Sequence, residues 1–127
     1  MPINPDVLAE AKALIAKAGM GNFKACDSAP PATGGKSIEI ALIDPPAREQ
    51  GVPYFDKPNP ARPDVVRSAS ILACLRDGEL LEPVVLFQRA GDERYELRDG
   101  FHRLHLCAAL GFTQIFAVFT KWQWDES

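Results

Sequence analysis

Glycine and proline residues divide this chain into short segments, and this division constrains the fold more than any other feature of the sequence. Within the segments, apolar residues recur either every three to four residues, as on one face of a helix, or every second residue, as in a half-buried strand. The expected order is helix, strand, helix, strand, strand, helix, strand. Such an order predicts an α+β fold: a small mixed sheet with packed helices.

The expected elements follow from these patterns and from the residues that begin and end helices. We expect helices over residues 4–19, 63–78 and 101–110, and strands over residues 37–44, 80–88, 94–98 and 113–120. In the first helix, Asn4 is a suitable N-cap, Pro5 suits the first helical position and Gly19 suits the end.

The first helix precedes a segment rich in Gly, Pro, Ala and Ser. We therefore predict that residues 1–36 form an N-terminal helix and a flexible linker, and that residues 37–127 form the main domain. The extra N-terminal helix either packs on that domain or binds a protein partner, and packing is the favoured interpretation.

Composition limits the function classes that are open. The chain has 127 residues, a length typical of one domain, and a net charge of −3 without a block of Lys or Arg, so we do not expect a DNA-binding protein. It has no apolar run long enough to span a membrane and no pattern of a signal peptide, so we expect a cytoplasmic protein. The three cysteines lack zinc-ligand spacing, and Cys74 and Cys107 lie in apolar helical patterns typical of core residues.

The most informative segment is Asp99-Gly100-Phe101-His102-Arg103, between a predicted strand and a predicted helix. The start of a helix exposes backbone N–H groups and the positive end of the helix dipole. Cations in the first turn are unfavourable unless an anion lies opposite them, which makes this segment a candidate anion site that holds the phosphates of a nucleotide. A guanidinium can grip phosphate oxygens in a fork, and an imidazole can donate a further hydrogen bond.

The same residues also have a purely structural interpretation. Asp99 would then cap the helix, His102 would lie on the surface and Arg103 would pair with an acid. His105 lies three residues after His102, but without a third ligand we expect no metal site there, and His105 is better explained as a partly buried polar residue.

Together these segments resemble the ParB/sulfiredoxin superfamily over residues 37–120. The resemblance rests on residues 71–86 (ILACLRDGELLEPVVL), 95–103 (YELRDGFHR) and 108–118 (AALGFTQIFAV). In the family, the second of these stretches is a strand followed by a phosphate-binding turn. The resemblance implies a nucleotide ligand (ATP, ADP or CTP), with or without Mg²⁺, and implies that Arg62 in the segment NPARP also faces phosphate.

The turn separates the chemistries of the superfamily. Sulfiredoxins have Gly-Cys-His-Arg with a catalytic cysteine, and Phe101 stands in that place here, so we do not expect repair of sulfinic acids. ParB proteins that bind CTP have a turn of the Gly-Glu-Arg-Arg type. Free serine kinases have Asp-Gly-His-His-Arg, the most similar to Asp99-Gly100-Phe101-His102-Arg103.

Three hypotheses of function follow from the resemblance. The first is a nucleotide-binding domain with a regulatory or recruiting role. The second is a small-molecule kinase in which Glu49 is the general base and Asp99 helps to place Mg²⁺. The third is a ParB-like DNA-binding or nuclease protein. A homodimer is a further expectation, with Phe116, Phe119 and the two tryptophans as candidate interface residues, although burial within the fold is the more ordinary explanation for them.

Overall fold

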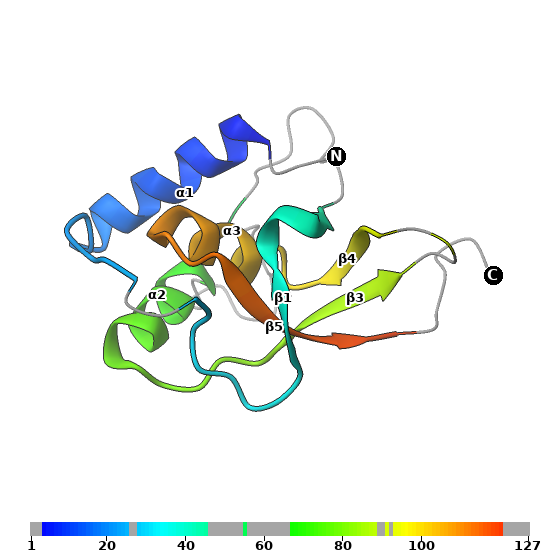
Figure 1. Ribbon diagram of the computed structural model, residues 1–127. Coiled ribbons are helices and arrows are strands. Elements are labelled where there is room, and N and C mark those ends of the chain that lie inside the picture. The colour runs from blue at the N-terminus through cyan, green and yellow to red at the C-terminus, as the bar shows by residue number, and fades with distance from the viewer. Residues whose placement is uncertain are drawn as a thin grey trace, which may run out of the picture.

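The computed structural model describes residues 4–25, 28–45, 55, 67–88, 91 and 93–120. The elements among these residues are, in chain order, α1 (Pro5–Lys17), β1 (Lys36–Glu39), the 3-10 helix η1 (Ile40–Leu42), β2 (Ile43–Asp44), α2 (Arg67–Asp77), β3 (Val84–Gln88), β4 (Tyr95–Asp99), α3 (Phe101–Leu110) and β5 (Gln114–Phe119). The fold is α+β, as the sequence predicted, and the N-terminal helix is present (Figure 1).

The strands form one mixed, curled sheet in the order β1-β5-β3-β4-β2. β1 is antiparallel to β5 and β3 is antiparallel to β4, whereas β3 is parallel to β5 and β2 is parallel to β4. β1 and β2 are therefore at opposite edges of the sheet, although only η1 separates them along the chain. Four residues reach at most about 14 Å from Glu39 to Ile43, so this short connection requires the sheet to curl into a half-barrel.

The 3-10 helix corrects the continuous strand that we predicted over residues 37–44. Ile38, Ile40 and Ile43 are all buried, but Ile43 would point to the opposite face if one strand continued through all three positions. The turn η1 shifts the alternation of side chains between the two faces of the strand, so that Ile43 points into the core. It also transfers the chain from the β5 side of the sheet to the β4 side.

The three helices share one hydrophobic core with the sheet. α3 packs against both α1 and α2 (Figure 1). α1 contributes Val7, Ala11 and Ile15 to this core. The Asn4 side chain accepts a hydrogen bond from the backbone N–H of Asp6 at 2.8 Å, which confirms Asn4 as the N-cap. The favoured interpretation of the N-terminal helix, packing on the domain, is what the structure shows.

The described part of the segment predicted as a linker makes several main-chain hydrogen bonds, with the residue Leu81 before β3 and with the start of β5. The N–H of Thr33 donates to the carbonyl of Leu81 at 2.9 Å, and the N–H of Leu81 donates to the carbonyl of Pro31 at 3.0 Å. The carbonyl of Ser28 accepts from Thr113 and Gln114. The division of the chain after residue 36 stays a prediction from composition.

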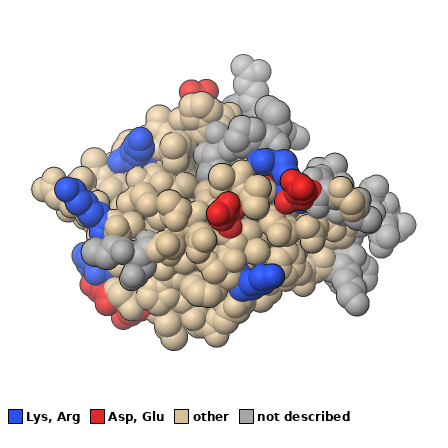
Figure 2. Space-filling view, viewed as in Figure 1, with Lys and Arg blue, Asp and Glu red and all other residues tan. Residues whose placement is uncertain are grey.

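Charged side chains lie scattered over the face shown in Figure 2, where Lys and Arg alternate with Asp and Glu and no large patch of one sign is visible among the described residues. In the described part of the chain, no helix has the length and apolar character that crossing a bilayer requires.

Candidate functional site

The turn between β4 and α3 depends on glycine at position 100. Gly100 has a φ of 106°, in the left-handed region, and a Cβ at this position would lie 2.6 Å from Cγ1 of Val84. The missing side chain therefore lets the start of α3 lie directly against the start of β3. The carbonyl of Gly100 accepts a hydrogen bond from the N–H of Leu104 at 2.9 Å.

The N-terminus of α3 has no side-chain cap, so Asp99 does not have the capping role that its sequence position allowed. The first N–H groups of any α-helix have no acceptor within the helix, and they carry the positive end of its dipole. In α3 this end adjoins a pocket, because Asp99, Gly100 and the first three residues of the helix all contribute to the pocket wall.

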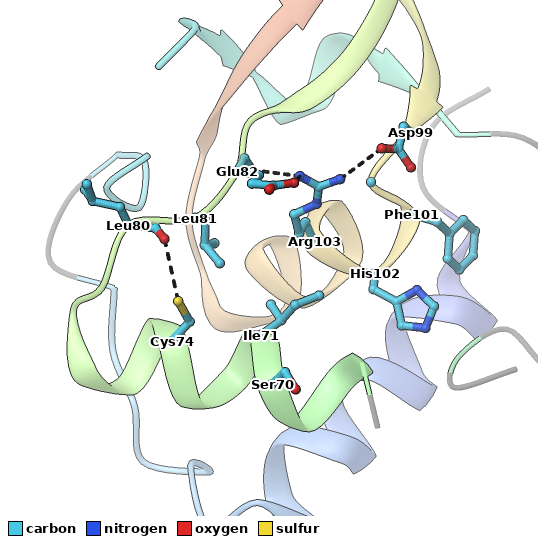
Figure 3. Close-up of a pocket in the computed structure, with 11 residues that line it drawn as sticks. Ser70, Ile71, Cys74, Leu80, Leu81, Glu82, Asp99, Phe101, His102 and Arg103 are labelled. Carbon is cyan, nitrogen blue, oxygen red and sulfur yellow. Dashed lines mark hydrogen bonds and ion pairs between the residues drawn. The ribbon is translucent and has the colours of Figure 1, made fainter. Parts of the chain in front are cut away.

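Arg103 lies at the centre of this site (Figure 3). Its Nη1 donates to the carbonyl oxygen of Glu82 at 2.9 Å and to that of Pro83 at 3.0 Å. Its Nη2 donates to Oδ2 of Asp99 at 3.3 Å, and Oε2 of Glu82 lies 3.9 Å from Nη1. The cation in the first turn of α3 is therefore surrounded by oxygen atoms of the same chain, and these atoms orient it.

Phe101 and His102 point away from Arg103 (Figure 3). The Phe101 ring centroid lies 4.2 Å from that of His105 and 5.8 Å from that of Phe55, and His102 meets Phe55 edge to face at 5.3 Å. Both side chains are buried, at 8% exposed each, so His102 is not the surface residue of the structural interpretation. Phe101 can contribute to anion binding only through its backbone, whereas the His102 imidazole lies at the pocket wall.

His105 is fully buried, more so than the sequence suggested. Its Nδ1 lies 2.7 Å from the carbonyl oxygen of Phe101. A carbonyl only accepts hydrogen bonds, so Nδ1 carries a proton and donates. Among the described residues, no group of three or more His, Cys, Asp or Glu side chains gathers where it could hold a metal ion.

The pocket has a volume of about 460 Å³ and lies between α2, the segment before β3 and the start of α3. Its lining consists of Ser70, Ile71, Cys74, Leu80, Leu81, Glu82, Asp99, Gly100, Phe101, His102 and Arg103. One end is charged, at Arg103, and the opposite wall is apolar, at Ile71, Leu80 and Leu81 (Figure 3). Leu80 is 60% exposed, which leaves an apolar surface at the rim of the pocket.

Cys74 packs against the core, close to the position that we predicted for it, and it also contributes to the pocket wall. It is partly buried, and its Sγ lies 3.7 Å from the carbonyl oxygen of Leu80. Burial raises the pKa of the Cys74 thiol, and the carboxylate of Glu79 raises it further. The thiol is therefore protonated at neutral pH and serves as a weak donor rather than as a nucleophile.

The structure brings together the predicted turn residues 99–103 and adds a wall that sequence reasoning missed. Nothing in the sequence around Ser70 and Ile71 indicates that they line a pocket, because only the packing of α2 beside α3 places them there. The contacts of Arg103 with the carbonyl groups of Glu82 and Pro83 could not be predicted from the sequence either, since main-chain oxygens are present at every position. Glu49 and Arg62 lie outside the described residues, so their proposed roles stay predictions.

Fold and site together define an α+β domain with a two-ended pocket at the N-terminus of a helix. The sequence matches no protein-family model, and a search of curated proteins finds no significant match.

Proposed function

We propose that this pocket binds the phosphate groups of a nucleotide (ATP, ADP or CTP), and that the protein is a ParB/sulfiredoxin-like domain with a regulatory or recruiting role. The observation that carries the proposal is the position of Arg103. Its guanidinium is fixed by two main-chain carbonyl groups in the first turn of α3, at the charged end of a pocket.

Electrostatics supports an anionic ligand at this end. The N–H groups at the start of α3, the helix dipole and Arg103 all favour negative charge at this end of the pocket. Only 14% of the Arg103 side chain is exposed, so its attraction for a bound anion is less screened than that of a surface arginine.

The size and the apolar wall support a ligand larger than a free phosphate ion. Pockets for small molecules commonly have volumes of about 300–1,000 Å³ and combine apolar walls with a few polar groups. The volume here, about 460 Å³, lies within that range. A nucleoside would lie against Ile71, Leu80 and Leu81 while its phosphates reach the start of α3.

The residues at the turn support a regulatory or recruiting role rather than the repair of sulfinic acids. Phe101 replaces the cysteine on which sulfiredoxin activity depends, and its ring lies among aromatic side chains. The kinase hypothesis needs Glu49, and the DNA hypothesis needs a basic surface. No observation on the described residues favours either of them, and both stay predictions from the resemblance.

Calorimetric titration of the intact protein with ATP, ADP and CTP, each with and without magnesium, tests the proposal. We expect saturable binding of at least one nucleotide and chemical-shift changes at the backbone amides of residues 101–103. In Arg103→Lys the nucleotide affinity should fall by about tenfold or more, because a lysine cannot reproduce the fork of charged hydrogen bonds.

Arg76→Lys is the matched control, since Arg76 is an exposed arginine on α2 that pairs with Asp77 and does not line the pocket. It should bind nucleotide like the wild-type protein. Circular dichroism verifies that both variants are folded. Failure of all three nucleotides to bind the folded wild-type protein would refute the proposal.

A further inference from the structure

The oxygen atoms around Arg103 fall into two classes, fixed and replaceable. The carbonyl groups of Glu82 and Pro83 are fixed, because the hydrogen bonds of Leu81 with Pro31 and Thr33 tie the preceding main chain in place. These two carbonyl groups occupy Nη1 at 2.9 and 3.0 Å and orient the guanidinium whether or not a ligand is present.

The Asp99 carboxylate is the replaceable partner. Its side chain is 68% exposed, whereas that of Arg103 is 14% exposed. A solvated carboxylate that leaves an ion pair regains its hydration, and exposed ion pairs contribute little to stability. Asp99 can therefore move away from Nη2 at low cost, but Arg103 cannot move away from the carbonyl groups.

Asp99 lies where a ligand anion would bind. It contacts Nη2 at 3.3 Å, it lines the pocket, and it directly precedes the Gly100 turn. An incoming phosphate that is to pair with Nη2 must displace this carboxylate, since two anions on the same donor repel each other.

We propose that Asp99 is a built-in competitor for Arg103: its carboxylate occupies the guanidinium in the absence of ligand and is displaced when a phosphate group binds. This inference rests on the proposed function of the pocket and concerns how that site is controlled. The competitor keeps simple anions off Arg103, so that a ligand must make further contacts in the pocket to bind. It assigns Asp99 a role different from capping and from placing a metal ion.

Glu82 provides an internal comparison. It carries the same charge and also lies beside Arg103, but its Oε2 is 3.9 Å from Nη1 and its side chain is 85% exposed. Removal of either charge reduces general repulsion of an anion by a similar amount. Only removal of the Asp99 charge weakens a direct hydrogen bond to the guanidinium, because it replaces a charged acceptor with a neutral one.

The experiment is a titration of the full chain with inorganic phosphate and with pyrophosphate, in the wild type, Asp99→Asn and Glu82→Gln. We expect Asp99→Asn to bind both anions about two- to fivefold more tightly than the wild type, and Glu82→Gln to gain clearly less. In the wild type, the ¹³C resonance of the Asp99 carboxyl should shift on addition of pyrophosphate, which a purely structural aspartate would not show.

Equal or weaker binding by Asp99→Asn, or an equal gain in Glu82→Gln, would overturn the inference. If nucleotide binding still depended on Arg103 in that case, the proposed function would stand without a competitor. If no nucleotide, phosphate or pyrophosphate bound to either the wild type or Asp99→Asn, both the inference and the proposed function would be wrong.

Discussion

At the scale of single residues, Gly100 has the most demanding position in the site. It combines a left-handed backbone with a contact distance that excludes a side chain, since a Cβ would lie 2.6 Å from Val84 Cγ1. Gly78 also has a positive φ, of 70°, but a Cβ there would meet nothing within 4 Å. A substitution at Gly78 therefore measures the cost of the left-handed backbone alone, whereas a substitution at Gly100 adds the cost of a steric clash.

Gly100→Ala should lower the free energy of unfolding by about 2–3 kcal/mol, and Gly78→Ala by about 1 kcal/mol. Urea unfolding followed by circular dichroism measures both values. In the double variant Gly100→Ala, Val84→Ala, the loss should be smaller than the sum of the single losses, because the shortened side chain at position 84 relieves the clash. Equal losses at the two glycines would show that the contact with Val84 does not matter.

At the scale of elements, α1 was the part of the chain whose role the sequence left open. Its apolar stripe is compatible with a helix that packs on the domain, the favoured interpretation, and with a helix that binds a partner. The structure buries Val7, Ala11 and Ile15 against the rest of the core, so the stripe is already covered. A partner that binds α1 would have to use its exposed polar face.

Ile15→Ala should reduce the free energy of unfolding by about 2–4 kcal/mol, because Ile15 is only 5% exposed and its truncation leaves a cavity. Lys12→Ala changes an exposed residue of the same helix, and its effect should remain within about 0.5 kcal/mol. Chemical denaturation compares the two. A small effect of Ile15→Ala would mean that α1 is an appendage whose packing contributes little to the stability of the domain.

At the scale of the whole molecule, the Asp44–Arg94 pair holds one edge of the sheet in place. Nε of Arg94 lies 3.0 Å from each carboxylate oxygen of Asp44, and Nη2 donates to the carbonyl oxygen of Ala41 at 3.1 Å. One arginine on the β4 side therefore secures both η1 and β2. The hydrogen bonds from Arg94 lower the pKa of Asp44 from its ordinary value of 3.8, although burial opposes part of this effect.

This lowered pKa makes stability depend on pH in acid. The carboxylate stabilises the fold above the unfolded-state pKa, and that contribution is lost as the pH falls through the lower pKa of the folded state. The free energy of unfolding should therefore decline below about pH 4. Asp44→Asn should lose about 1–2 kcal/mol at neutral pH and show a shallower decline in acid.

Glu10→Gln, which removes an equal charge from an exposed position on α1, serves as the control for net charge. Its acid decline should parallel that of the wild type in urea titrations between neutral pH and about pH 3. If Asp44→Asn declined as steeply as the wild type, groups other than this pair would dominate the acid sensitivity.

The sequence by itself determined the turn and most of the elements, with the break at η1 as the exception. Apolar periodicity, Asn4 at a helix start and Gly19 just after a helix end are local signals, and the patterns place α1, α3 and β5 closely. The segment at residues 99–103 was also visible, because a glycine between strand and helix and a cation in the first turn conflict with local preferences.

Only the tertiary structure determined which residues from other parts of the chain lie around residues 99–103. The break at η1, the burial of His102 and His105 and the pocket wall on α2 depend on contacts between segments far apart in the chain, which no local pattern encodes. The same holds for the main-chain carbonyls that orient Arg103. From the sequence, Arg103 was a cation in the first turn of a helix, where an anionic partner is expected. The tertiary structure places two fixed carbonyl groups and one replaceable carboxylate around it.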